Sequence, residues 1–207
     1  FSGVTDIYNN GSLSDLTLSG VGSYIPNVHL TAANADTTVT WASAATTVGT
    51  SDAMTVALSA AATTASSTLT ANGIETFNVL ASTASGSATT TQTLTSSSAK
   101  TVAITGDATT NITVNLAGAG ATAALAGSVT GNAAANIMDI TADSTDKISV
   151  DLGAGDDTLT MSSIGALATL AGGDGADTLK LTQAVATAAS ASATISGFST
   201  LNISDAG

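Results

Sequence analysis

The sequence predicts an all-β protein whose C-terminal half is a right-handed parallel β-solenoid, preceded by further β-rich coils. Three observations support this: a composition dominated by Thr, Ser and Ala, short alternating runs that recur about every ten residues, and two glycine-aspartate nonapeptides. Abundant Thr and a single proline suit many strands. Hydrophobic residues make up 43% of the 207 residues and aromatic residues only 3%, so thin layers of Ala, Val, Leu and Ile must build the core.

The alternating runs define the predicted strands. Apolar and polar residues alternate in them with period two, which places the apolar side chains on one side of each strand, where stacked coils would bury them. Neighbouring runs start about ten residues apart, as two strands per coil would require. In chain order the predicted strands are residues 101–105, 111–116, 136–140, 146–150, 157–161, 168–170 and 177–181.

The chain divides into a β-rich N-terminal part, residues 1–98, and the solenoid, residues 99–207. Three consecutive serines at residues 96–98 suggest a linker between them. A helix is an alternative for the Ala-rich residues 184–193, but the Ser and Thr within that segment and its short length argue against it.

An internal repeat accompanies this division. Residues 71–79 align with residues 195–203 as an element G-[IF]-x-T-[FL]-N-[VI], and residues 2–7 echo its opening. The glycine suits a tight turn and the following alternation suits a strand. We therefore expect each copy to close one stack of coils and to begin another.

The two nonapeptides are the strongest functional signal. Residues 172–180, GGDGADTLK, fill every specified position of the repeat G-G-x-G-x-D-x-U-x, which binds Ca²⁺ in parallel β-rolls. Residues 152–160, LGAGDDTLT, form a second copy with Leu152 in place of the first glycine. Asp157 and Asp177 are 177 − 157 = 20 residues apart, near the 18 of an ideal coil. The loops should therefore stack, with one Ca²⁺ between them.

The distribution of charge agrees with a metal site. Fifteen acidic residues face three lysines and no arginine, giving a net charge of −12, which makes nucleic acid an improbable partner. Eight of the aspartates lie within residues 139–177. A solvated acidic surface is the alternative interpretation, but carboxylates packed this closely would repel one another unless a cation neutralised them.

The sequence gives little support for a catalytic function. His29, the single histidine, lies in an alternating run at residues 27–31, where a solvent-facing or hydrogen-bonded ring is expected. The sequence has no G-x-S-x-G or H-E-x-x-H motif, no cysteine and no apolar run long enough to span a membrane. We predict a protein that is not an enzyme. The chain starts at Phe1 without a signal peptide, and we expect a fragment or a processed product of a larger protein.

Together, the nonapeptides, the GIETFNV element at residues 73–79, the Thr/Ala/Ser richness and the scarcity of basic residues resemble bacterial surface-layer proteins of the RTX type. The nonapeptide likeness covers residues 152–180 and the compositional likeness the whole chain. Many members carry long arrays, whereas this chain has one perfect and one imperfect repeat.

This resemblance implies type I secretion, Ca²⁺-dependent folding outside the cell, and self-assembly into a lattice at the bacterial cell surface. A segment outside this chain would anchor the lattice to lipopolysaccharide. An alternative is a Ca²⁺-folded RTX module of a secreted adhesin or hydrolase. The implied metal site, with Asp157 and Asp177 as side-chain ligands, comprises Gly153, Gly155, Asp156, Asp157, Gly172, Gly173, Asp174, Gly175 and Asp177.

Overall fold

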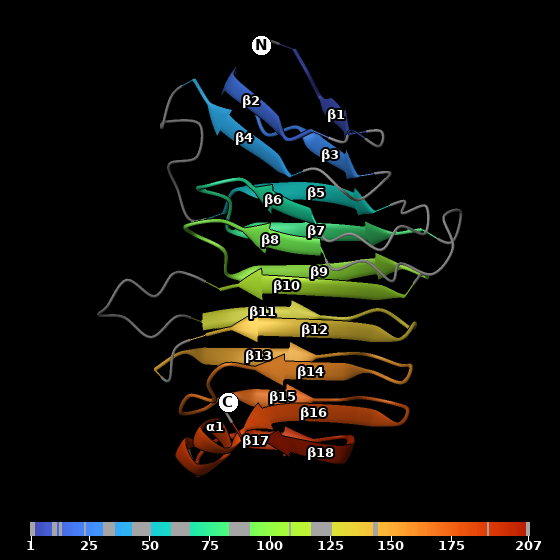
Figure 1. Cartoon of the computed structure of the whole chain (residues 1–207), viewed down its shortest axis with the longest axis vertical. Coiled ribbons are helices and arrows are strands. Elements are labelled where there is room, and N and C mark those ends of the chain that lie inside the picture. The colour runs from blue at the N-terminus through green and yellow to red at the C-terminus, as the bar shows by residue number, and fades with distance from the viewer. Residues whose placement is uncertain are drawn as a thin grey trace.

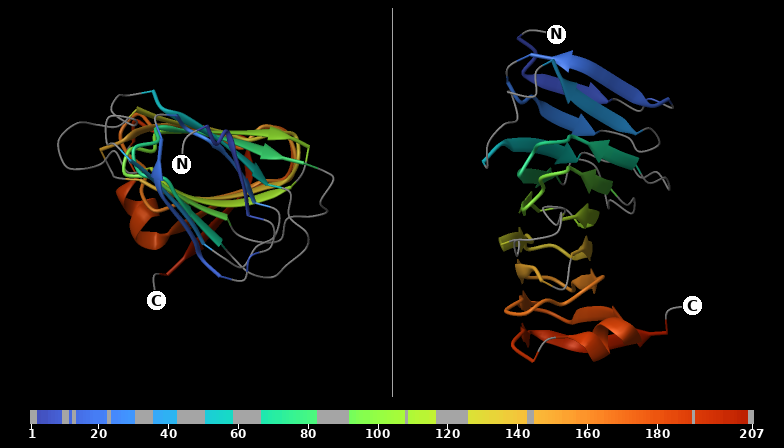
Figure 2. Two further views of the ribbon diagram at one scale, coloured as in Figure 1. Left: turned by 90° about the horizontal axis from the view of Figure 1, so that it is seen from above. Right: turned by 90° about the vertical axis from the view of Figure 1, so that its left-hand side faces the viewer.

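The computed structural model describes residues 3–9, 12, 14–22, 24–30, 36–42, 51–58, 67–82, 92–107, 109–116, 126–142, 145–189 and 191–205. These residues form a tall stack of parallel strands around one apolar core (Figure 1). Along the stack axis the chain follows an oval path whose long sides are two sheets (Figure 2). The predicted all-β parallel solenoid is confirmed.

Odd-numbered strands form one nine-stranded sheet and even-numbered strands form the other, each in sequence order. Each coil is therefore an odd strand, a corner, an even strand and a second corner. The odd sheet contains β1 (Asp6–Asn9), β3 (Asn27–Leu30), β5 (Ala53–Leu58), β7 (Thr76–Ala81), β9 (Thr101–Gly106), β11 (Ala126–Thr130), β13 (Lys147–Asp151), β15 (Thr169–Ala171) and β17 (Thr194–Ser196). The even sheet contains β2 (Leu16–Val21), β4 (Thr37–Trp41), β6 (Ser67–Thr70), β8 (Gln92–Thr95), β10 (Thr110–Asn115), β12 (Asn136–Thr141), β14 (Thr158–Met161), β16 (Asp177–Thr182) and β18 (Phe198–Ser204).

Alternation along the strands builds the core. In β12 and β13 every second residue is buried. Parallel pairing in register then places similar side chains of neighbouring coils next to each other, for example Leu159 and Leu179. The seven strands predicted between residues 101 and 181 are all present, as β9, β10 and β12 to β16.

Pairing continues across residue 98, because β7 pairs with β9 and β8 pairs with β10. Residues 96–98, expected as a linker, lie in a corner of the coil. The Ser96 hydroxyl is buried there and donates to the Ile74 carbonyl at 2.7 Å.

One helix, α1 (Gln183–Ala188), corrects the expectation of no helix in this region. The backbone N–H of Val185 donates to the Thr182 hydroxyl at 3.2 Å, which makes Thr182 an N-cap. Val185, Ala186 and Ala189 pack against the core. Capping and tertiary packing thus stabilise a helix that would be marginal alone.

The three repeated elements share one local structure. Gly3, Gly73 and Gly197 all have positive φ, and β1, β7 and β18 follow them. The predicted turn and strand are confirmed. The expectation that each element separates two stacks is wrong, because β7 pairs with β5 on one side and β9 on the other.

Candidate metal centre

Three corners that lead from an odd strand to an even strand lie one above another at one edge of the solenoid. They comprise residues 131–136, 152–157 and 172–177. In the lower two, the Asp174 N–H donates to the Gly153 carbonyl and the Gly155 N–H donates to the Asp174 carbonyl, both at 2.9 Å. The two nonapeptide loops therefore lie in direct contact.

Glycine is required where these corners touch. Gly173 has φ +101°, and a Cβ there would lie 1.8 Å from the Gly153 carbonyl oxygen. Gly175 has φ +139°, and its Cβ would lie 2.0 Å from the Gly155 oxygen. Any side chain would push the loops apart and strain the backbone. The motif glycines thus set the close spacing of the corners.

Both motif aspartates point into the solenoid. Asp157 is 1% exposed and Asp177 is fully buried. Asp177 Oδ1 accepts the backbone N–H of Asp157 at 2.8 Å, and Asp157 Oδ1 accepts the backbone N–H of Asn136 at 2.6 Å. Each carboxylate thus satisfies a donor of the preceding coil. We call the stacked set Thr110, Asn136, Asp157 and Asp177 the corner ladder.

Half of each aspartate carboxylate in the corner ladder lacks a partner. Oδ2 of Asp157 and Oδ2 of Asp177 are both buried and accept no hydrogen bond. Burying an anionic oxygen without compensation is costly. Burial raises the pKa of Asp157, and the nearby charges of Asp177 and Asp156 raise it further, against the opposing hydrogen bonds from Asn136. A proton or a cation would relieve this cost.

Ca²⁺ fits these orphaned oxygens in charge and hardness, since it prefers carboxylate and carbonyl oxygens. The described residues contain no group of three or more His, Cys, Asp or Glu side chains placed to hold a metal ion. If Ca²⁺ were held here, Oδ2 of Asp157 and Oδ2 of Asp177 would be its carboxylate ligands, and backbone carbonyls and water would have to complete the six to eight ligands that Ca²⁺ takes.

The other residues of the predicted site have different surroundings. The Asp156 and Asp174 side chains are exposed. Asp156 Oδ1 accepts the Ala176 N–H at 2.8 Å, so it fixes the loop below. Gly172 is buried beside Asp177, whose Oδ2 would lie 2.8 Å from a Cβ at that glycine. Gly153, Gly155, Gly173 and Gly175 shape the turns.

Sequence reasoning missed the third corner. Gly131 and Asn136 stand at the positions that Gly172 and Asp177 occupy, and the Ala154 N–H donates to the Asn132 carbonyl at 3.2 Å. Asn136 pairs with Thr110 through a 2.8 Å side-chain hydrogen bond. The signal was the spacing of Asn136 from Asp157, which is 21 residues, close to the 20 between the two aspartates.

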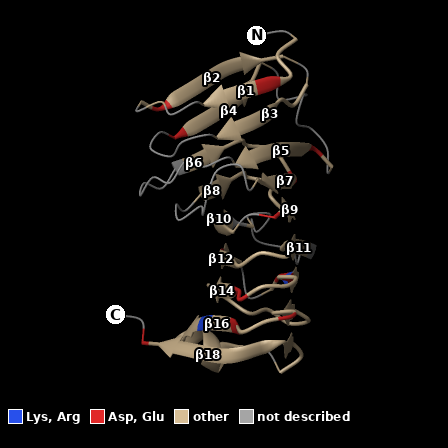
Figure 3. Ribbon diagram, turned by 90° about the vertical axis from the view of Figure 1, so that its right-hand side faces the viewer, with Lys and Arg blue, Asp and Glu red and all other residues tan. Residues whose placement is uncertain are grey.

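On sequence grounds no second ion is expected at the opposite edge of the solenoid, because the loop at residues 162–165, which faces Asp143 and Asp146, has no acidic residue. Asp146 is buried there, and the Ser162 hydroxyl accepts from the Ala142 N–H at 3.0 Å. Asp143 lies outside the described residues. Acidic residues lie at several corners of the stack (Figure 3).

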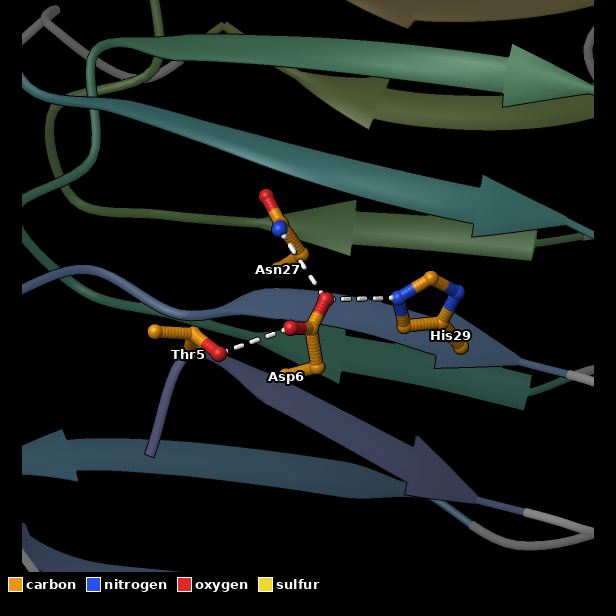
Figure 4. Close-up of polar contacts among 4 residues, drawn as sticks. All are labelled: Thr5, Asp6, Asn27 and His29. Atoms are coloured by element: carbon orange, nitrogen blue, oxygen red, sulfur yellow. Dashed lines mark hydrogen bonds and ion pairs between the residues drawn. The ribbon is translucent and has the colours of Figure 1, made fainter. Parts of the chain in front are cut away.

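A second polar cluster lies on the outer face of β1 and β3 (Figure 4). Asp6 Oδ1 accepts from Asn27 Nδ2 and contacts His29 Nε2, both at 3.0 Å. The hydrogen bond with His29 contributes most to lowering the pKa of Asp6 to about 2, with Asn27 and Thr5 adding to it. Tyr8 stacks on His29 with ring centroids 4.1 Å apart. The hydrogen-bonded imidazole predicted for His29 is found, and the cluster fastens the first strand to its neighbour.

Within the part of the chain that the structure describes, no helix has the length and apolar character needed to cross a membrane. A scan against protein-family models, a search of curated proteins and a search of solved structures each returned no match for this chain.

Proposed function

We propose that this chain is a structural subunit of a bacterial surface layer, in which Ca²⁺ stabilises the solenoid and copies assemble into a two-dimensional lattice outside the cell. The observation that carries the proposal is the pair of buried, unpartnered Oδ2 atoms of Asp157 and Asp177 in adjoining corners. A divalent cation bound to these buried oxygens would compensate their charge in the folded chain. The unfolded chain has no such buried pair, so binding would stabilise the folded state.

The corner ladder itself supports an electrostatic role for the ion. Asn136 occupies the same position one coil earlier, where its Nδ2 donates to Asn132 Oδ1 at 3.1 Å and to the Ala134 carbonyl at 2.6 Å. A neutral amide therefore finds partners at this position where a carboxylate does not. The aspartates at this position in the next two coils would be stabilised if a cation bound to their unpartnered Oδ2 atoms.

Extended solenoids suit a lattice subunit for a further reason. Each coil contacts only its neighbours, so the stack is long relative to its cross-section and presents two broad sheet faces (Figure 1). Such a shape offers repeated surfaces for lateral contacts between copies. Ca²⁺ would act by fixing the coils whose corners carry the paired aspartates.

The test compares wild type with Asp177→Asn, Asp177→Ala and the control Asp139→Asn, which changes an exposed carboxylate of β12. Millimolar Ca²⁺ should raise the melting temperature of wild type and Asp139→Asn, since a ligand at a hundred times its Kd stabilises by about 2.7 kcal/mol. Asp177→Asn keeps the acceptor for the Asp157 N–H and removes the buried charge. It should be at least as stable as wild type in chelator and should no longer respond to Ca²⁺.

Asp177→Ala removes the acceptor as well, so it should be less stable than Asp177→Asn in chelator. Calorimetric titration with Ca²⁺, with Mg²⁺ as the comparison ion, measures binding directly. Equal Ca²⁺ affinities for wild type and Asp177→Asn would contradict a metal centre at the corner ladder.

Assembly is tested by negative-stain imaging of the same proteins. Ordered sheets at millimolar Ca²⁺, dispersed by chelator, are the expected result for wild type. A chain that binds Ca²⁺ and stays monomeric at high concentration would overturn the lattice and favour a Ca²⁺-folded module of a secreted adhesin or hydrolase instead.

A further inference from the structure

The outward side chains of β12, β14 and β16 form one surface on the side of the stack. Along each strand they alternate with buried core residues, and they are Ile137, Asp139, Thr141, Thr158, Thr160, Thr178, Lys180 and Thr182. We call this surface the even face. Among the described elements, none lies in front of these three strands in Figure 1, and helix α1 lies to the left of β16.

Two opposite charges lie in one row of the even face. Asp139 pairs in register with Thr160, and Thr160 pairs with Lys180. Neighbouring strands lie about 4.8 Å apart, so Asp139 and Lys180 are about 10 Å apart, which is too far for an ion pair. Both side chains are exposed, and neither forms an ion pair with any residue that the structure describes.

We infer that the even face of one copy binds the even face of a second copy about a two-fold axis that runs parallel to β14 and passes over Thr160. Such an axis keeps the strand direction and reverses the direction of the stack. Each Asp139 then faces Lys180 of the second copy, because these residues lie one coil before and one coil after Thr160 in the same row. One two-fold contact thus forms the same ion pair twice.

The same charges exclude the other simple two-fold arrangement. An axis along the row, parallel to the stack, would place two copies in the same direction. Asp139 would then face Asp139, and Lys180 would face Lys180. Like charges opposite each other oppose association. The row therefore specifies the direction of the second copy as well as the surface that it binds.

Net charge and exposed apolar surface favour the same face. With a net charge of −12, two copies repel one another over most of their surfaces. Asp139 and Lys180 are the only charged residues of the even face, so its charges cancel. Ile137, which is 43% exposed, would lie opposite Thr178 of the second copy, since both residues pair with Thr158. Association would remove this apolar side chain from water.

The size of the face indicates a weak contact. Together with one further coil on each side, it covers roughly 400 Å² per copy, at about 4.8 Å per coil and about 17 Å per strand. Each partner of a standard interface buries about twice this area. The inference rests on the proposed self-assembly and identifies one of its contacts, in which repetition across a lattice would add to the affinity of each pair.

A crosslink at the axis tests the contact, because a residue there faces the same residue of the second copy. The sequence contains no cysteine, so Thr160→Cys supplies a single thiol. In millimolar Ca²⁺, a bis-maleimide that spans about 10 Å, the separation of two packed sheets, should join two copies. Circular dichroism checks folding, and Thr158→Cys, also on β14, replaces Thr160→Cys if that variant does not fold. Denaturing electrophoresis and intact mass measure the dimer.

Charge reversals in this cysteine-containing parent test the ion pairs. Asp139→Lys and Lys180→Asp each place like charges opposite one another, so each alone should form at least about tenfold less dimer. An equimolar mixture of the two should form heterodimers, and Asp139→Lys/Lys180→Asp should form homodimers, both as abundantly as the parent. The control Lys147→Asp, which makes the same change of charge at an exposed lysine of β13 in the other sheet, should crosslink like the parent.

A parent that gives no dimer at millimolar protein concentration would overturn the face-to-face contact. Equal yields for Asp139→Lys and the parent, or a mixture without heterodimers, would overturn it as well. The outcome is separable from the lattice proposal. Ca²⁺-dependent sheets formed by a parent that does not crosslink would leave the lattice standing without this contact. Crosslinked dimers without sheets at any Ca²⁺ concentration would leave this contact standing without the lattice.

Discussion

The element at residues 73–79 and its copy at residues 197–203 have nearly the same pattern and opposite environments. In the first copy Ile74, Phe77 and Val79 are completely buried, because coils lie on both sides of β7. In the second copy, Leu201 and Ile203 hold the positions of Phe77 and Val79 and are exposed. Burial in a solenoid is thus decided by the neighbouring coil and not by the strand's own sequence.

The largest expected effect comes from truncating the same position in both copies. Phe77→Ala should reduce the free energy of unfolding by about 3 to 5 kcal/mol, since it leaves a cavity in a closed layer. Leu201→Ala should change it by less than about 0.5 kcal/mol. Urea unfolding at low protein concentration measures both. Similar losses would mean that the last coil is covered in the monomer.

The glycines of the element sharpen the comparison further. Gly197 has φ +76°, and its Cβ would lie 2.8 Å from the Gly173 nitrogen, whereas Gly3 has φ +81° with no atom within 4 Å of its Cβ. Gly3→Ala should therefore cost about 1 kcal/mol from conformation alone. Gly197→Ala should cost about 2 to 3 kcal/mol, because a backbone shift is added. Thermal unfolding of the two variants side by side tests this.

A third comparison concerns two carboxylates: Asp157, which has a coil on each side, and Asp6, which lies on the first coil. The pKa of Asp157 is raised above 3.8, so the native state holds its proton more tightly than the unfolded state. In chelator, the free energy of unfolding should therefore fall as pH rises from about 3.8 through the raised pKa. Ca²⁺ should suppress this fall, and Asp157→Asn should abolish it. Unfolding curves from pH 3 upward would contradict this if they kept the same slope in Asp157→Asn.

Asp6 should behave in the opposite sense and by the smallest amount. Its pKa falls from 3.8 to about 2, so its contribution is complete above pH 3.8 and is lost as pH falls toward 2. The group is exposed, and solvent screening keeps the effect small. Faster amide exchange in β1 of Asp6→Asn at neutral pH, with little change in β9, is the expected readout. Uniform loss of protection along the stack would contradict this local role.

Strand positions between residues 136 and 181 could be predicted because the coils there are nearly uniform in length. Strand β11, which pairs Ser128 with Thr101 across 128 − 101 = 27 residues, was not predicted. Asp157 and Asp177 are 20 residues apart, and the pairing of Asn136 with Asp157 spans 21. Earlier coils vary more: Asp6 pairs with Asn27, 27 − 6 = 21 residues on, whereas Thr37 pairs with Leu69, 69 − 37 = 32 residues on. Because the coil length varies there, the sequence shows no regular repeat. The N-terminal part is therefore predicted only as β-rich and not as part of the same solenoid.

The candidate site was predictable in position but not in detail. Glycine spacing was enough to place the two loops in contact. It could not indicate that each aspartate uses Oδ1 for a backbone N–H of the preceding coil, because that depends on the exact register between coils. The capped helix α1 escaped prediction for a related reason, since Thr182 acts as a cap only where the chain leaves β16.

The corner ladder ends at Phe198, which pairs with Asp177 where the next aspartate would stand. Ser199 is inserted as a bulge there, and its hydroxyl donates to the Asp177 carbonyl at 3.1 Å. The coils from residue 136 to residue 177 are thus tied at this corner by buried carboxylates as well as by strand pairing, whereas the final coil is tied there through the hydroxyl of Ser199. Under a force applied along the axis, we expect the C-terminal coil to unfold first and the coils that contain Asp157 and Asp177 to unfold later. Residues 136–177 would then be the most mechanically stable segment of the stack.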